Sequence, residues 1–307
     1  MQDAAARNAP PEVALAGTSR KAIPRVDFLN PPGAAALYSP DSLAWRVFKN
    51  PVALFTGGIA AVLLELAEPR VRSGVWGHSI FPTDPLTRIR RTGAVTHASV
   101  YAPAETATRM IQMVNRMHAR VEGRTPAGVP YRANDPELLD WVQATASYGF
   151  MEAYAAFVYP FTDEERNRFY AESEAVARLF GAVGAPRSLA DQRAQFEAMR
   201  PHLVDHPIVH EFLGIMKKTP ALPLPLRPLQ IMMLRAGVSL LPDWLRERLN
   251  LHEEWRLKEW ERGVLRWLGA RFDHLPISGA PPVQACRRLG LPKDYLYRSR
   301  INQNTPG

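Results

Sequence analysis

An apolar run from Val52 to Ala67 limits the fold more strongly than any other part of the sequence. Asn50-Pro51 precedes the run and Glu68-Pro69 follows it, and its near-continuous apolarity is typical of a helix buried on most sides. The run is shorter than the about 20 apolar residues that a membrane span needs, and it contains Glu65. We therefore predict a buried helix over this run.

Apolar residues recur at helical spacing along most of the remaining chain, whereas strand-like alternation is almost absent. Residues 70–79 are interpreted as a glycine-broken bend, and 125–131 as an extended connection or a small hairpin. Capping and proline signals predict helices that begin near 41, 51, 84, 104, 135 and 162, followed by helices over 188–200, 207–217, 227–240 and 252–271. The pattern predicts an all-α fold with a single large helical domain.

The composition suits one domain with less ordered ends. A hydrophobic content of 46% over 307 residues is enough for a sizeable core. We expect a flexible N-terminal arm over residues 1–37, the helical domain over 38–284, and a basic, poorly packed tail over 285–307.

Charge and cysteine content exclude several classes of protein. The formal net charge is +8, but the arginines are scattered and form no basic stripe interleaved with aromatic residues, so we expect no nucleic-acid partner. The lone Cys286 excludes an internal disulfide framework and a cysteine-rich metal site. The N-terminus carries no secretory signal pattern, and we therefore expect a cytoplasmic protein.

His118 is the first candidate for a ligand, because it lies within a methionine-rich apolar pattern. Met113, Met117, Val114 and Val121 share its stretch, and helical spacing predicts that they fall on one side of the helix. A lone histidine in such a pattern is more often a satisfied core residue, so the pattern by itself leaves both interpretations open.

A cationic helix face and a glycine-flanked histidine are the other candidates. The start at Asp84-Pro85 brings Arg88, Arg91 and Thr92 to one side of the next helix, at spacings of three and four. A solvated helix face is the usual role of such arginines. His78, between Gly77 and Ser79, could line a pocket or lie on a surface turn.

The order of these motifs resembles the catalytic-domain family shared by MpaB-type oxygenases and latex-clearing rubber oxygenases. The resemblance covers roughly residues 38 to 250, and the pieces that carry it are PDSLAWRVF at 40–48, TGGIAAVLLELAEP at 56–69, GHS at 77–79, RIRRT at 88–92, RMHARVEG at 116–123, YRANDPELLDWV at 131–142 and LLPDWLR at 240–246. The resemblance implies an all-helical fold with a buried cofactor pocket, non-covalent haem b, and use of O2 to cleave isoprenoid C=C bonds.

The same resemblance implies roles for individual residues. His118 would be the proximal iron ligand, with its second nitrogen hydrogen-bonded, and Met113 and Met117 would form part of an apolar wall. Arg88, Arg91 and Thr92 would contact a haem propionate or steady bound O2, and we include His78 and Gln143 among the cofactor-binding residues.

Three departures from the family pattern bear on the chemistry. Gln143 stands where the family often has histidine, and Arg91 where a rubber oxygenase has lysine. Glu65 and Glu68 are the nearest candidates for the proposed base. The sequence thus predicts a haem-dependent oxygenase that acts with O2 on a small isoprenoid or otherwise lipophilic substrate.

Two alternatives remain at this point. The first is a non-catalytic protein that binds lipophilic ligands in the same fold, which Gln143 suggests. The second is a weak association with membrane surfaces through the basic ends and apolar helices, which does not exclude an enzyme. The sequence leaves the oligomeric state open.

Overall fold

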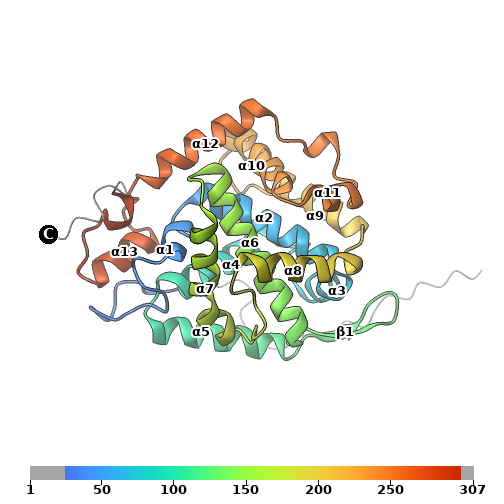
Figure 1. The fold of residues 1–307 in the computed structure, drawn as a ribbon, viewed down its shortest axis with the longest axis horizontal. Coiled ribbons are helices and arrows are strands. Elements are labelled where there is room, and N and C mark those ends of the chain that lie inside the picture. The colour runs from blue at the N-terminus through green and yellow to red at the C-terminus, as the bar shows by residue number, and fades with distance from the viewer. Residues whose placement is uncertain (1–24, 299–307) are drawn as a thin grey trace, which may run out of the picture.

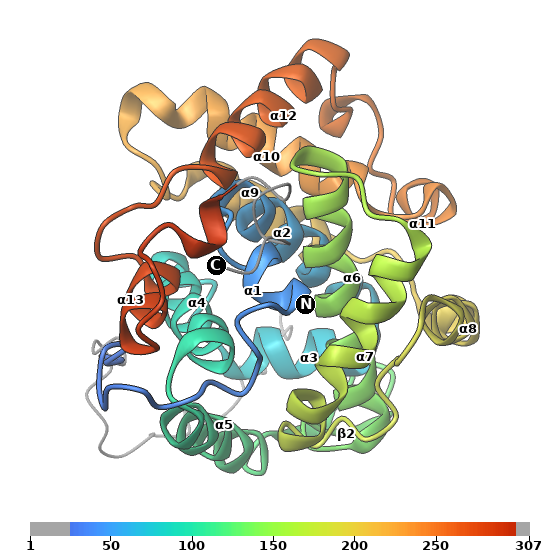
Figure 2. The ribbon, with the colours of Figure 1, turned by 60° about the vertical axis from the view of Figure 1, so that its left-hand side comes forward.

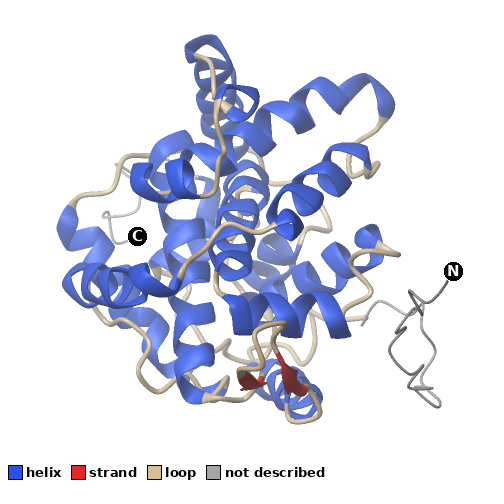
Figure 3. Cartoon of the chain, turned by 90° about the vertical axis from the view of Figure 1, so that its right-hand side faces the viewer, coloured by secondary structure: helices blue, strands red, loops and turns tan. Residues whose placement is uncertain are grey.

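The elements of the computed structural model, which describes residues 25–298, are almost entirely helical (Figure 3). Within that range there are thirteen α-helices, four short 3-10 helices and one antiparallel pair of strands, which confirms the all-α prediction. The α-helices are α1 Leu43–Val47, α2 Pro51–Ala67, α3 Pro69–His78, α4 Pro85–Tyr101, α5 Ala104–His118, α6 Pro136–Phe157, α7 Asp163–Leu179, α8 Leu189–Met199, α9 Pro207–Lys218, α10 Arg227–Ser239, α11 Asp243–Arg248, α12 Glu259–Asp273 and α13 Pro281–Arg288. The remaining elements are β1 Glu122–Arg124, β2 Pro130–Arg132, η1 Arg200–His202, η2 Leu224–Leu226, η3 Glu253–Trp255 and η4 Tyr295–Tyr297.

The apolar helix α2 lies inside the molecule, with α6 packed along it (Figures 1 and 2). Gly57 of α2 and Gly149 of α6 face each other so closely that a Cβ on either residue would lie within 2.7 Å of the other's carbonyl oxygen. Helices α10, α12, α3 and α9 also pack against α2. The predicted burial of this helix is therefore confirmed, and Gly57 serves close helix packing.

Local capping signals place several helix starts where the sequence predicts them. The side chains of Ser42, Asp84, Asp135 and Thr162 accept hydrogen bonds from backbone N–H groups at the starts of α1, α4, α6 and α7. Thr162 and Glu165 form a reciprocal capping box. These bonds satisfy donors that a helix start otherwise leaves free.

Residues 69–78 form helix α3, although the sequence indicates a broken bend. Glu68 accepts a 2.7 Å hydrogen bond from the N–H of Val71 and caps the helix, and Pro69 occupies its first turn. Gly74 lies inside this helix without breaking it, and a Cβ added there would meet the Tyr131 ring at an ordinary contact distance of 3.6 Å.

The hairpin begins at Glu122, closer to the end of α5 than the range 125–131 that the sequence indicates. Helix α5 ends at His118, and Gly123 lies in β1 instead of closing the helix. A Cβ at Gly123 would lie 2.7 Å from the hydroxyl of Tyr131, which is its partner on β2. The small hairpin considered for 125–131 is thus present, with its strands at 122–124 and 130–132.

The described parts of the expected arm and tail pack against the helical body. Phe28 is buried, and Arg288 donates to the carbonyl oxygens of Phe28 (2.7 Å) and Ala34 (2.8 Å). Cys286 and Leu296 are also buried. Residues 25–37 and 285–298 therefore differ from the flexible ends that the sequence indicates, while residues 1–24 and 299–307 lie outside the described range.

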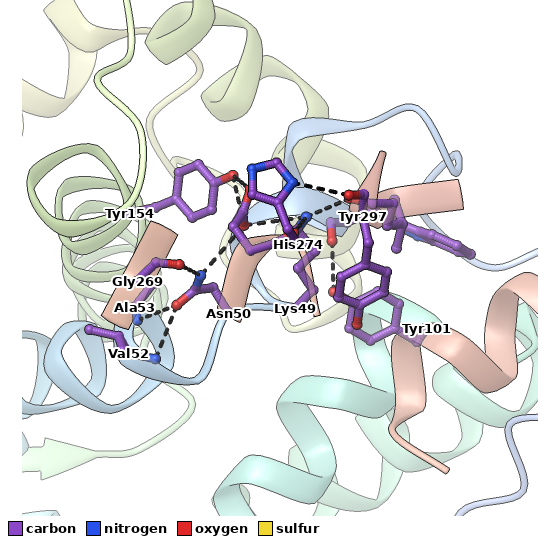
Figure 4. Close-up of polar contacts among 12 residues, drawn as sticks. Lys49, Asn50, Val52, Ala53, Tyr101, Tyr154, Gly269, His274 and Tyr297 are labelled. Carbon is purple, nitrogen blue, oxygen red and sulfur yellow. Dashed lines mark hydrogen bonds and ion pairs between the residues drawn. The ribbon is translucent and has the colours of Figure 1, made fainter. Parts of the chain in front are cut away.

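A buried polar joint connects α2 and α6 with the C-terminal elements (Figure 4). The ammonium of Lys49 lies 3.3 Å from the carboxylate of Asp273, and Tyr154 donates to that carboxylate at 3.0 Å. Asn50 caps α2 and donates to the carbonyl of Gly269 at 2.9 Å. This joint fixes α12 against the start of α2.

One pair of helices comes near the requirements for a membrane span. No single helix among residues 25–298 is long and apolar enough to cross a membrane. Helices α2 and α3 meet the length and composition limits only together, and they are bent by 110° relative to each other.

Candidate functional site

Polar side chains from four helices come together at the inner end of α2. Glu65 lies on α2, Arg88 on α4, His118 on α5 and Thr145 on α6. The positive charge of Arg88 lowers the pKa of both Glu65 and His118, so Arg88 lies within electrostatic range of each group. We refer to Glu65, Arg88 and His118 as the polar triad.

Glu65 is a carboxylate in an apolar environment. Burial raises its pKa to about 7, although the charge of Arg88 and the Thr145 hydroxyl act in the opposite direction. The Oγ1 atom of Thr145 lies 3.5 Å from the carboxylate, at the limit of a hydrogen bond. Glu65 therefore exchanges a proton near neutral pH.

Glu68, the other acidic candidate, has a structural role. Its Oε2 atom caps α3 at Val71, and its Oε1 atom accepts a 2.8 Å hydrogen bond from Nε of Arg70. The side chain is almost fully buried in these contacts. The structure thus leaves Glu65 as the acidic member of the site.

Arg88 is held in place by two hydroxyl groups. Its Nε donates to Oγ of Ser79 at 3.1 Å, and its Nη1 donates to Oγ1 of Thr92. Burial lowers the pKa of Arg88, and the charge of Glu65 opposes that shift. Arg88 and Thr92 share a helix face as their spacing predicts, and the charge of Arg91 also acts on Arg88.

His118 has the protonation state that a metal requires of an imidazole. Burial lowers its pKa, and the charge of Arg88 lowers it further, so the ring is neutral near pH 7. Its Nδ1 atom is buried and has no hydrogen-bond partner among the described residues. The resemblance implies that one ring nitrogen binds iron and that the other is hydrogen-bonded, and this hydrogen bond is not found at Nδ1. The neutral ring fits a ligand role, because haem iron takes one neutral histidine.

The methionines do not form the buried wall expected around His118. The exposed fraction is 36% for Met113 and 55% for Met117. Five residues of helix correspond to a rotation of about 140°, so Met113 cannot share a face with His118. The inner face of α5 instead carries the buried residues Ala107 and Ile111.

His78 and Gln143 make contacts outside the polar triad. The exposed His78 ends α3, and its Nε2 atom lies 3.3 Å from the hydroxyl of Tyr131 on the hairpin. Gln143 donates to Oγ of Ser147 at 3.2 Å within α6. No described contact joins either residue to the triad, and their expected cofactor roles remain predictions.

The first part of α4 is accessible along its whole circumference. Every residue from Pro85 to His97 keeps part of its surface exposed, whereas Ala98 to Tyr101 are buried. A helix face packed into a core would include fully buried positions. Arg88, Arg91 and Thr92 can therefore meet a ligand without opening the core.

Comparison with known families gives one match. The model described as ER-bound oxygenase mpaB/B'/rubber oxygenase, catalytic domain, matches residues 45–272. The chain belongs to this family. The match includes all three members of the polar triad and the helices that carry them, and the mpaB/rubber oxygenase family is one of oxygenases. No curated protein matches the chain, and no solved structure does.

Sequence reasoning missed two hydroxyl groups that contact the polar triad. No local pattern singles out Ser79, which accepts from Arg88, or Thr145, which lies beside Glu65. Glu65 carried the clearest signal, because it is the one acidic residue inside the run from Val52 to Ala67. An acidic side chain in an otherwise apolar helix indicates either a partner or a function.

Proposed function

We propose that this chain is a haem b-dependent oxygenase that acts with O2 on a lipophilic small molecule, with His118 as the iron ligand. The observation that carries the proposal is the neutral imidazole of His118, with its unpartnered Nδ1 atom beside Arg88. The match to an oxygenase family over residues 45–272 supports the reaction class.

Haem, when bound, supplies the one-electron and O2 chemistry that protein side chains lack. The residues of the chain supply position and charge. His118 presents a nitrogen from a helix, and Arg88, fixed by Ser79 and Thr92, holds a positive charge that suits a propionate or a developing negative charge. Glu65 can take up or release a proton near pH 7.

The lipophilic substrate class rests on the family and on α5. Rubber, named in the family description, is a hydrocarbon polymer, and the exposed side chain of Met117, which precedes His118 in the chain, offers apolar contact surface on α5. The proposal also includes a cytoplasmic setting, where the buried thiol of Cys286 stays reduced.

The decisive experiment is the absorption spectrum of the full chain produced with added haem. We expect a Soret band in the native protein that is lost or shifted in His118→Ala. The matched control is His210→Ala, because His210 is an exposed histidine paired with Asp205 at 3.2 Å. That variant should keep the native spectrum.

Two outcomes would contradict the proposal. A native protein without a Soret band is not a haem protein, and a band unchanged in His118→Ala places the ligand elsewhere. A protein that binds haem and a lipophilic ligand but consumes no O2 with any tested substrate would instead support the non-catalytic binding protein.

A further inference from the structure

Helix α12 exposes an unusual stripe of large apolar side chains. The exposed fractions of Trp260, Val264 and Trp267 are 58%, 37% and 66%. Their spacings of four and three residues place them on one side of the helix, while Leu265 is fully buried on another. Packing within residues 25–298 does not explain two tryptophans that are exposed by more than half.

A second exposed apolar element precedes α10. Leu224 and Leu226 of η2 are exposed by 77% and 47%. Leu222, next to η2, packs against the same buried cluster as Leu265 of α12, and α10 and α12 lie at one end of the molecule (Figures 1 and 2). We call Leu224, Leu226, Trp260, Val264 and Trp267 the apolar ridge.

The surroundings of the apolar ridge carry unpaired positive charge. The segment 212–242 contains four basic residues and no Asp or Glu. The exposed carboxylates of Glu253, Glu254 and Glu259 are each within 3.6 Å of a Lys or Arg side chain. Within residues 25–298, no carboxylate lies within ion-pair distance of five cations near the ridge, Lys218, Arg227, Lys258, Arg266 and Arg271.

We propose that the apolar ridge docks onto the surface of an anionic lipid bilayer. Tryptophan favours the boundary between headgroups and acyl chains, and nearby Lys and Arg side chains attract anionic headgroups. A helix that lies in this boundary inserts one apolar side and keeps its cations at headgroup level. The inference goes beyond the proposed oxygenase function and does not depend on haem.

Charge favours a bilayer over a second copy of the chain. In a two-fold symmetric dimer the same surface patch faces itself, so Arg266 and Arg271 would approach the partner's cations. Like charges brought together in this way oppose association. An anionic surface satisfies both the apolar side chains and the surrounding charges.

Co-sedimentation of the full chain with lipid vesicles tests the proposal. We expect binding to vesicles of phosphatidylcholine with 30% phosphatidylglycerol, and at least tenfold weaker binding to pure phosphatidylcholine. Raising the salt concentration to 0.5 M should weaken binding to the anionic vesicles, because salt screens surface charge.

Two variants separate the apolar and electrostatic contributions. The double change Trp260→Ser with Trp267→Ser should reduce binding to anionic vesicles at least tenfold. The double change Arg266→Glu with Arg271→Glu should abolish the preference for anionic lipid. The control is Val183→Ser with Val204→Ser, two exposed apolar residues outside the ridge, which should bind as the native protein does.

Circular dichroism and thermal unfolding must first show that each variant is folded, as expected for changes to exposed side chains. The proposal is overturned if the native chain does not sediment with anionic vesicles, or if the tryptophan variant binds as well as the native chain. A native dimer that becomes monomeric in the tryptophan variant, without vesicle binding in either, would assign the ridge to self-association.

Discussion

Glu65 makes the stability of this protein depend on pH. Its pKa is raised by burial from 4.5 to about 7, so the folded chain holds a proton that the unfolded chain releases between these values. Because the folded state binds more protons than the unfolded state in this range, the free energy of unfolding falls as the pH rises from 4.5 to 7. Above pH 7 the ionisation of Glu65 lowers it no further. The loss comes from ionising a carboxyl group that is poorly solvated.

Replacing Glu65 with glutamine removes this ionisation and nearly keeps the side-chain shape. We expect Glu65→Gln to exceed the native protein by about 2–3 kcal/mol in free energy of unfolding at pH 8, and to match it at pH 4.5. Urea unfolding at both pH values measures the difference.

The control for this experiment is Glu211→Gln, a change at an exposed glutamate on α9. In Glu211→Gln, the free energy of unfolding should change between pH 4.5 and pH 8 by the same amount as in the native protein. An equal effect of Glu65→Gln at both pH values would show that Glu65 does not titrate abnormally.

The sequence allowed some residues of the candidate site to be predicted and others not. His118 and Arg88 were predicted, because each belongs to a motif with a local pattern. Glu65 and Glu68 could not be distinguished, since their roles depend on where α3 begins. The exposure of Met117 was also missed, because helical spacing shows which residues are neighbours but not which side is covered.

At the scale of the elements, the crossing of α2 and α6 depends on glycine. A Cβ on Gly57 would lie 2.7 Å from the carbonyl oxygen of Gly149 and 2.8 Å from Cα of Phe150, and backbone cannot move aside easily. We expect Gly57→Ala to lower the free energy of unfolding by about 1–3 kcal/mol, as overpacked cores do. Thermal or urea unfolding measures this change.

Gly58 provides a matched control on the same helix. A Cβ there would meet only a side-chain atom of Phe150 at 3.9 Å. Gly58→Ala should therefore be neutral, or stabilising by up to about 1 kcal/mol through helix propensity. If both changes altered the free energy of unfolding equally, the close approach of α2 and α6 would not depend on Gly57.

Helix starts were predicted well because their signals are local. Asp84 and Thr162 bind N–H groups within three residues, so the sequence contains the whole interaction. The sequence does not reveal why Gly123 is needed, because this glycine makes room for Tyr131, which follows it in the chain. Such contacts depend on the fold and leave no local pattern.

At the scale of the whole molecule, the two ends of the described chain hold each other. Arg288 is 3% exposed and donates to the carbonyl oxygens of Phe28 and Ala34, and the N–H of Gly33 donates to the carbonyl of Arg288. Because hydrogen bonds from a charged group are strong, we expect Arg288→Ala to cost about 2–4 kcal/mol in free energy of unfolding. Thermal unfolding measures the loss.

The same variant should detach residues 25–37 before the helices unfold, so limited proteolysis should cleave near Phe28 much faster than in the native protein. The neighbouring exposed Arg287 is the control, and Arg287→Ala should leave both measurements unchanged. Equal cleavage rates in Arg288→Ala and the native protein would contradict this role of Arg288.

The sequence indicated loose ends because residues 25–37 are rich in small and proline residues and the C-terminus is basic. Composition predicts disorder when a segment lacks its own apolar surface. Here the stabilising bonds join residues 254 and 260 positions apart, which no local pattern can reveal.

This separation also sets an order of events during synthesis of the chain. Residues 28 and 34 leave the ribosome before the arginine that binds them, which is 260 and 254 positions later, respectively. At about 5–20 residues per second, the first segment waits roughly 13–50 s for its partner. The carbonyl oxygen of Phe28 thus has no such donor until residue 288 has been made.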